Sequence, residues 1–239
     1  LTKQHERSSR AVAETRGQIL MYDGRVADAV YSAVCGGHTE DASSAWGSSG
    51  EPYLEGSYDG SSPIRRYGSL NKEKNVRAWL LSRPRAFCNS AENKTAPALN
   101  YTKKYFRWHT RVTQAELGSS IAAATGTDIG TVTALTPLKR GASGRIEKLR
   151  VSGTTGSVII DRELNIRRAL HATTLWSSCF YVTEEPPGSE APAAFVFHGA
   201  GFGHGVGMCQ AGAAGMALRG MSYRRILGHY YRNTSIRRI

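Results

Sequence analysis

Residues 197–217 read FHGAGFGHGVGMCQAGAAGMA and place two histidines, a thiol and an amide among seven glycines. Glycine at alternate positions from Gly201 to Gly207 leaves one side of an extended segment bare, so another surface can approach it closely. His204 lies between two of these glycines, and we expect it to meet a ligand rather than to serve only as a structural hydrogen-bonding residue. Gln210 follows at the expected start of a helix, where backbone and side-chain amides can bind hydroxyls or an anion. These groups suit a sugar ligand.

A second group of reactive residues is CGGH, from Cys35 to His38, with Cys88 further along the chain. The two glycines allow a tight turn, so Cys35 and His38 can reach one zinc ion and Cys88 can supply a third ligand. A disulfide between Cys35 and Cys88 explains the same cysteines if the protein is exported, and His38 is then a hydrogen-bonding residue. Free thiols are the third possibility. Zinc is expected to be bound by these residues, and the disulfide and the free thiols remain alternatives.

Glu40 is the candidate for acid or base chemistry, because it follows His38 and Thr39 and is expected to face a cleft. Glu14 has the position of a helix-end residue. No pair of carboxylates stands out as a glycosidase pair, and no GxSxG motif supports a Ser-His-Asp triad. Glu40 is therefore the one candidate catalytic residue that these motifs provide.

The composition is that of a globular protein with an anionic partner. Lys and Arg outnumber Asp and Glu by 31 to 19, a net charge of +12 over 239 residues, which suggests a nucleic acid, an anionic lipid or a cell-wall polymer. The basic residues are scattered in pairs, so we expect no nucleic acid partner. No apolar run approaches the roughly eighteen residues of a membrane span. The start, LTKQHERSSR, has no initiator Met and no signal-peptide apolar region, and we expect the chain to begin inside a longer product.

Short helices and strands must position these groups. Asp23-Gly24 between apolar runs predicts a hairpin, because both turn residues need positive φ. A helix is expected over residues 71–82, ended by Pro84. A strand over residues 193–199 leads into the glycine stretch, and helices are expected at about 209–219 and 222–231.

The middle of the chain has the pattern of a small inserted unit. Thr113 and Glu116 form a capping box for a helix that Gly126 ends. Three short strands are expected within residues 129–160, and Asp161 is expected to cap a further helix. We therefore predict an α+β fold with mixed, mainly antiparallel sheets and short helices. Its domains are expected to be a discontinuous core of residues 1–100 and 176–239, and an inserted α+β subdomain of residues 101–175.

Three longer stretches carry a resemblance. They read AVAETRGQILMYDGRVADAVYSAVCGGHTEDASSAWG with PYLEG, SGRIEKLRVSGTTG with RALHATTLWSSCFYV, and GAGFGHGVGMCQAGAAGMALRGMSYRRILGHYYRNTSI. Together they resemble the SpoIID/LytB family, the stage II sporulation protein D and amidase-enhancer proteins of bacterial cell walls. The resemblance runs from about Ala11 to Ile236, and its last motif is highly specific.

The resemblance implies an exported protein of the cell envelope or extracellular space that is directed at peptidoglycan. Sporulation members act as lytic transglycosylases, in which a carboxylic acid protonates the leaving oxygen of a MurNAc-GlcNAc bond and the muramoyl C6 hydroxyl closes an anhydro ring. One wall of a glycan groove is then predicted from the glycine stretch: Gly201, Gly203, His204, Gly205, Cys209 and Gln210. Some members bind zinc near CGGH, and Cys88 resembles a second cysteine of some relatives, which favours zinc without excluding a bridge.

The chain departs from the family pattern in two respects. It has no stretch resembling the upstream helix EALKAQAVAARTYA or the preceding glutamate that is usually held catalytic, so we expect a missing N-terminal segment or another chain to supply them. GMCQAGA has Cys209 and Ala211 where many members have Ser and Trp. The alternative function is therefore a non-catalytic module that binds glycan or enhances a cell-wall amidase.

Overall fold

The computed structural model describes residues 6–47, 50–61, 67–90 and 97–239. Over these residues the chain forms eight α-helices, two 3-10 helices and eleven strands in small sheets. Strands β3 and β10 pair in parallel, and the other paired strands are antiparallel. The predicted α+β fold with mainly antiparallel sheets is confirmed.

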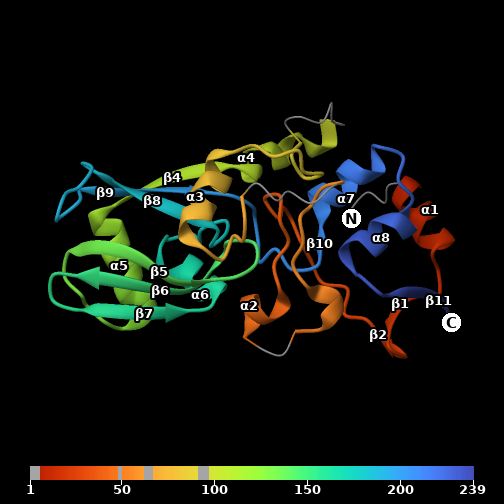
Figure 1. Cartoon of the computed structure of the whole chain (residues 1–239), viewed down its shortest axis with the longest axis horizontal. Helices are drawn as coiled ribbons and strands as arrows, with labels where there is room; N and C mark the ends of the chain where they lie inside the picture. The colour runs from red at the N-terminus through yellow and green to blue at the C-terminus, as the bar shows by residue number, and fades with distance from the viewer. Residues whose placement is uncertain (1–5, 48–49, 62–66, 91–96) are drawn as a thin grey trace.

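The two ends of the described chain meet in one sheet. Helix α1 (Glu6–Glu14) leads into β1 (Gln18–Tyr22), which pairs with β2 (Arg25–Val26) on one side and β11 (Ser235–Arg238) on the other. Asp23 and Gly24 have φ of 45° and 75°, so the predicted hairpin turn is confirmed. The first and last elements therefore lie together at one end of the molecule (Figure 1).

A first core is built around the chain segments that carry the reactive residues. It holds Cys35, Cys88 and Cys209 among its buried side chains. The elements around it are β3 (Tyr31–Ser32), α2 (Ala42–Trp46), the 3-10 helices Pro52–Leu54 and Pro97–Thr102, α4 (Lys103–Phe106), β10 (Met208–Cys209), α7 (Gln210–Ala217) and α8 (Tyr223–Tyr230). Helix α7 begins where the Cys209 Sγ accepts a hydrogen bond from the Gly212 N–H.

A second core lies at the other end of the molecule, between two three-stranded sheets and two helices (Figure 1). The sheets have the orders β4-β9-β8 and β5-β6-β7. The elements are β4 (Trp108–Thr113), α5 (Gln114–Thr125), β5 (Val132–Arg140), β6 (Ile146–Gly153), β7 (Ser157–Asp161), α6 (Glu163–Ala169), β8 (Phe180–Glu185) and β9 (Ala194–Gly199).

Capping was predicted correctly for one of these helices and wrongly for the other. Both halves of the Thr113–Glu116 capping box are present at α5, and Gly126 ends that helix with a left-handed φ of 70°. At α6 the N-cap residue is Arg162 with φ of 72°, and no side chain caps the helix. The prediction of an Asp161 cap was wrong because Asp161 is the last residue of β7.

A third, small cluster joins the two cores. Helix α3 (Glu73–Leu81) contributes Val76, Trp79 and Leu80, which pack with Leu70, Cys179 and Ala200. The predicted domain limits at residues 101 and 175 stay a prediction. Packing places the three aromatic side chains Phe180, Phe195 and Phe197 in the second core, together with the sheets of the middle section.

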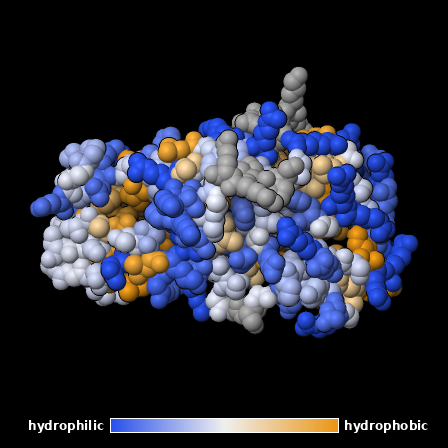
Figure 2. Space-filling view, in the orientation of Figure 1, coloured by the Kyte–Doolittle hydropathy of each residue, from blue (hydrophilic) through white to orange (hydrophobic). Residues whose placement is uncertain are grey.

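The surface is mostly polar, as the composition suggests. Figure 2 shows hydrophilic side chains over much of one face, with smaller hydrophobic patches between them. Among the described residues, no helix is long and apolar enough to cross a membrane.

Candidate functional site

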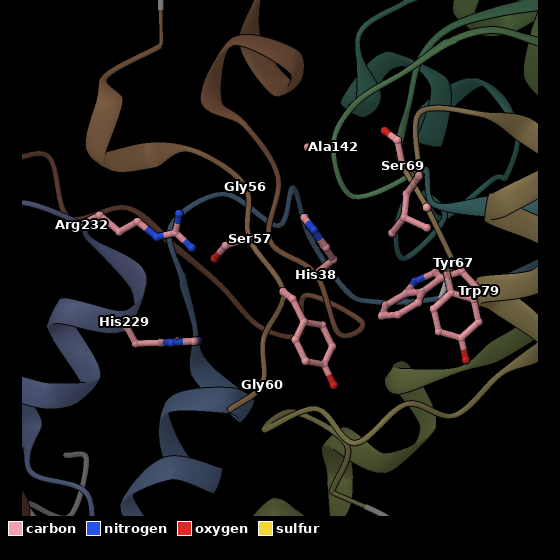
Figure 3. Close-up of a pocket in the computed structure, with 13 residues that line it drawn as sticks. His38, Gly56, Ser57, Gly60, Tyr67, Ser69, Trp79, Ala142, His229 and Arg232 are labelled. Carbon is pink, nitrogen blue, oxygen red and sulfur yellow. The ribbon is translucent and has the colours of Figure 1, made fainter. Parts of the chain in front are cut away.

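A pocket of about 530 Å³ lies where the two cores approach each other. We call it the junction pocket. It is lined by His38, Gly56, Ser57, Tyr58, Gly60, Tyr67, Gly68, Ser69, Leu70, Trp79, Ala142, His229 and Arg232. Figure 3 shows Tyr67 and Trp79 on one side, His229 and Arg232 on the opposite side, and His38 with Ser57 between them.

The aromatic side of the junction pocket is held together by ring contacts and a hydrogen bond. The Trp79 ring is 2% exposed and meets the edge of the Tyr67 ring, with 5.2 Å between ring centroids. The Tyr58 ring lies 6.3 Å from Trp79, and its hydroxyl donates a hydrogen bond of 2.5 Å to the Arg85 carbonyl. Aromatic rings facing a guanidinium and two imidazoles can bind a molecule that has both apolar faces and polar or anionic groups.

His38, one of the predicted metal ligands, lies in the wall of this pocket. Its ring is half-buried, and Nδ1 lies 2.7 Å from the Thr39 carbonyl oxygen, so the ring is the donor in that hydrogen bond. Burial lowers the pKa of His38 below its usual value, which keeps the imidazole neutral at neutral pH. The structure does not bring His38 to the cysteines with which the CGGH spacing suggested it would act.

The cysteines form a different group, which we call the four-residue cluster: Cys35, Asp59, Cys88 and Cys209. The three sulfur atoms and a carboxylate oxygen lie within 4.8 Å of one another, and each residue is 3% exposed or less. Cys35 and Cys88, which the sequence analysis paired, have their Sγ atoms 3.5 Å apart, and all four cysteines of the chain are free in this structure. The cluster can hold a metal ion.

The sequence analysis did not predict two members of this cluster as metal ligands. Asp59 follows the pocket residue Tyr58 in a loop without a motif, and nothing in the sequence marks it. The sequence did distinguish Cys209, because this cysteine stands where many SpoIID/LytB relatives have serine. The sequence analysis nevertheless placed it in the predicted glycan groove, because it lies in the GMCQ motif. In the structure Cys209 is 0% exposed and belongs to the four-residue cluster.

The three thiols differ in their ease of ionisation. Burial raises the pKa values of Cys35 and Cys88 well above the usual range. Burial also acts to raise the pKa of Cys209, but hydrogen bonds from the Cys35 and Cys88 thiols overcome it and lower that pKa to about 5. Cys209 is therefore the thiol of the cluster that ionises most readily.

Glu40, the candidate acid, is 1% exposed and does not line the junction pocket. Its carboxylate accepts hydrogen bonds from the Ser143 hydroxyl at 2.6 Å and the Asp41 N–H at 2.9 Å. A Cβ placed on Gly141 would lie 2.5 Å from its Oε1 atom, so the turn between β5 and β6 covers it closely. In this structure Glu40 joins two segments of the chain, and its role as an acid stays a prediction.

The burial of Glu40 predicts a dependence of stability on pH. Desolvation outweighs the nearby Ser143 and Arg145 and raises its pKa from 4.5 to about 7. Because the pKa is higher in the folded state, Glu40 supports folding below pH 4.5, and that contribution, about 3 kcal/mol, is lost as the pH rises through 7. We expect Glu40→Gln to remove this loss in urea titrations at pH 5 and pH 8. Glu14→Gln, at an exposed site on α1, is the control, and an unchanged pH dependence in Glu40→Gln contradicts the assignment.

The alternating glycines of residues 201–207 are explained by packing within the chain. A Cβ on Gly201 would lie 2.8 Å from the Val34 carbonyl oxygen, and one on Gly205 would lie 2.5 Å from the Arg145 guanidinium carbon. A Cβ on Gly207 would overlap the Val30 carbonyl oxygen. The surfaces that approach these glycines closely are therefore residues 30–35 and Arg145 of the same chain. None of residues 201–210 lines the junction pocket.

The parts of this stretch that a ligand can reach are few. Gly203 and His204 are half-buried and Gln210 is exposed, whereas Gly201, Gly205 and Cys209 are buried. The His204 ring lies 5.2 Å from the Trp46 ring, and its Nδ1 accepts a hydrogen bond from the Val206 N–H. Burial and the nearby Arg145 lower the pKa of His204 to about 4, so it is neutral at neutral pH. Glycan binding by Gly203, His204 and Gln210 stays a prediction.

The fold and site define a basic α+β protein with a polar and aromatic pocket between two cores and a thiol-rich cluster beside it. Comparison with known proteins supplies the family. Residues 40–207 match a family described as a domain of unknown function (DUF8618), and the chain belongs to that family.

Three curated relatives are similar over nearly the whole chain. The chain is 29% identical over 238 residues, 96% of its length, to a Bacillus subtilis protein named Amidase enhancer. It is 28% identical over 95% of its length to an uncharacterized protein of Brachyspira hyodysenteriae and to Stage II sporulation protein D of Bacillus amyloliquefaciens. These matches confirm the resemblance to the SpoIID/LytB family. The chain spans 32%, 47% and 49% of the lengths of these three relatives.

Proposed function

We propose that the chain acts on peptidoglycan and binds glycan strands in the junction pocket. The observation that carries the proposal is the arrangement of rings and cations around that 530 Å³ pocket, in a chain related to an amidase enhancer and a sporulation protein. Tyr67, which packs on the buried Trp79, can stack on the apolar face of a sugar ring. Arg232, on the opposite side, can bind the lactyl carboxylate that distinguishes muramic acid from glucosamine.

The reaction that we propose for the protein is lytic transglycosylation. An acid donates a proton to the leaving glucosaminyl oxygen, the bond from that oxygen to muramoyl C1 breaks, and the muramoyl C6 hydroxyl bonds to C1 and releases its proton to the conjugate base. Glu40 has a suitable pKa of about 7, but its enclosure by Gly141 and Ser143 favours a structural role. The chain's own contribution in this proposal is to bind and orient the strand.

The binding test compares two arginines of equal charge. Arg232→Gln is expected to weaken binding of a muramic-acid-containing glycan fragment about tenfold in calorimetry, because a charge-assisted hydrogen bond is lost. Arg237→Gln, on exposed strand β11, removes the same charge away from the pocket and should leave the affinity unchanged. Equal losses in both variants would mean that general surface charge, rather than the pocket, attracts the glycan.

The groove predicted at His204 is tested in the same assay. If the strand passes along the glycine stretch as well as through the junction pocket, His204→Ala weakens its binding. An unchanged affinity in His204→Ala together with a loss in Arg232→Gln restricts glycan binding to the junction pocket. Incubation of the protein with peptide-free glycan strands should release anhydromuramoyl products detectable by mass spectrometry, and their absence would contradict the transglycosylase proposal.

The second candidate function is enhancement of a cell-wall amidase without chemistry of its own. It is favoured by the name of the Bacillus subtilis relative. It predicts that the chain sediments with peptidoglycan, releases no anhydromuramoyl product and raises the rate of a purified cell-wall amidase on the same material. Under either function we propose that the protein is exported and works in the cell envelope or outside the cell, where peptidoglycan is found.

Zinc is the metal ion that we propose for the four-residue cluster. Thiolate ligands favour zinc over magnesium, calcium and manganese, which prefer oxygen ligands. The proposal thus keeps the zinc, Cys35 and Cys88 of the sequence analysis and replaces His38 by Asp59 and Cys209.

A further inference from the structure

The four-residue cluster brings together parts of the chain that are far apart in sequence. Cys35 and Cys88 are separated by 53 positions and Cys35 and Cys209 by 174. Their sulfur atoms and a carboxylate oxygen of Asp59 all lie within 4.8 Å of one another. In a tetrahedral zinc site with Zn–S bonds of about 2.3 Å, the sulfur atoms are about 3.8 Å apart. The observed 3.5 Å between Cys35 and Cys88 is close to that spacing.

A disulfide leaves part of this arrangement unexplained. A bond between Cys35 and Cys88 uses two thiols and leaves Cys209 and Asp59 buried beside it. The Asp59 carboxylate is 0% exposed, and in the described part of the chain its ion-pair contact is His229, whose Nε2 lies 3.7 Å from Oδ1. That distance is too long for a hydrogen bond. A buried carboxylate next to three thiols is stabilised most effectively by a cation among them.

Hydrogen bonds already hold the ligand atoms in place. The Cys88 N–H donates to Asp59 Oδ2 at 3.0 Å, and the Tyr230 hydroxyl donates to Oδ1 at 2.7 Å. The Cys35 N–H donates to the Cys209 Sγ at 3.2 Å. Bonds of this kind orient the ligands of protein metal sites and raise their affinity. Four protein ligands in a buried cluster form a closed site, which is the structural rather than the catalytic kind.

The cluster also adjoins the walls of the junction pocket. Asp59 follows Tyr58, and its N–H donates to the Gly37 carbonyl at 2.9 Å, next to His38. His38 and Tyr58 face each other in a β-bridge, and both line the pocket. His229 lines the opposite side and lies beside Asp59. One ligand, Asp59, is thus bonded to Tyr58, is hydrogen-bonded to the residue before His38 and lies beside His229.

We infer that Cys35, Asp59, Cys88 and Cys209 form a closed zinc site that fixes His38 and Tyr58 in the wall of the junction pocket. The proposal of the metal site rests only on the positions of its four ligands. Its effect on glycan binding rests on the function proposed above. The ion would supply positive charge to the buried sulfur and carboxylate atoms, and the chain supplies all four ligands.

The first test measures metal in the 239-residue chain purified without added metal. We expect about one zinc per chain, and cobalt substitution should give the near-ultraviolet charge-transfer absorption of several thiolates. Cys209→Ser and Asp59→Asn should each lower zinc affinity at least about tenfold, whereas Cys179→Ser, which changes a buried free cysteine outside the cluster, should leave it unchanged. His38→Ala should also retain zinc.

Three results would each contradict the proposed zinc site. An intact mass lower by two hydrogens without zinc identifies a Cys35–Cys88 disulfide. Loss of zinc in His38→Ala with retention in Asp59→Asn and Cys209→Ser identifies the ligand set that CGGH suggested. Equal loss in Cys179→Ser means that the effect is general unfolding.

The second test follows the pocket without any glycan. Removal of zinc should increase hydrogen exchange of amides in residues 36–39 and 57–60 about tenfold, while residues 146–151 in the second core are unaffected. Unchanged exchange at 36–39 and 57–60 contradicts the role in the pocket wall. If zinc binds and orders these residues but glycan fragments do not bind, the proposed function fails and the metal site remains.

Discussion

Arg145→Met is expected to lower the free energy of unfolding by about 3–5 kcal/mol, the usual effect of removing one member of a buried charged network. Arg145 is 1% exposed and has no carboxylate in direct contact within the described residues. Its guanidinium donates to the Gly203 carbonyl at 3.2 Å, the Ser143 hydroxyl at 2.9 Å and the Cys35 carbonyl at 3.3 Å. The Ser143 hydroxyl in turn donates to Glu40.

Arg145 therefore connects the glycine stretch, the CGGH turn and Glu40. Methionine fills a similar volume but leaves both carbonyl oxygens without this donor and removes the positive charge that favours the ionised form of Glu40. We expect the pKa of Glu40, about 7 in the native chain, to rise further in the variant, since the arginine favours its ionised form. Urea unfolding measures the first effect, and the pH dependence of stability measures the second.

Arg150→Met is the matched control for this prediction. Arg150 lies on β6, which begins directly after Arg145, but its side chain is exposed, so the substitution removes the same charge without disrupting a buried network. We expect it to change stability by less than about 0.5 kcal/mol. Similar small losses in Arg145→Met and Arg150→Met would show that the buried guanidinium does not hold these segments together.

The second large effect is expected from Gly207→Ala, which should destabilise the chain by at least about 3 kcal/mol more than Gly220→Ala. Both glycines have positive φ, 68° and 78°, so both alanine variants carry the same kind of backbone strain, about 1–2 kcal/mol. A Cβ on Gly220 meets nothing within 4 Å, whereas one on Gly207 overlaps the Val30 carbonyl oxygen. The difference between the two variants isolates this overlap.

Thermal and urea unfolding of the two variants give the measurement. Gly207→Ala must separate β10 from the segment before β3, because the overlap is with backbone and cannot be relieved by rotation of a side chain. Loss of zinc from Gly207→Ala is a further expected result, since Cys209 is two residues away. Equal stabilities for Gly207→Ala and Gly220→Ala would contradict the close approach of residues 30 and 207.

Local elements of this fold were predictable because their causes are local. The Asp23-Gly24 turn follows from the φ values that a two-residue hairpin needs, and the ends of α5 follow from Thr113, Glu116 and Gly126. The cap of α6 was not predictable in this way. Asp161 has the right side chain for a cap, but pairing of β7 with β6 extends through it, and the helix begins beyond it.

The candidate site was predictable only in part. The sequence by itself determined that Gly201–Gly207 has room for no side chain at alternate positions, and that Cys35 and Cys88 are candidate partners. It did not determine what fills the space beside those glycines, or which ligands complete the cysteine pair. Only the tertiary structure places Val30, Val34 and Arg145 against the glycines, and Asp59 and Cys209 beside Cys35. The physical reason is that a glycine indicates that a position has little space, and a cysteine indicates a possible ligand. The group that lies against the glycine, or that completes the ligand set, can come from any segment that packing brings near.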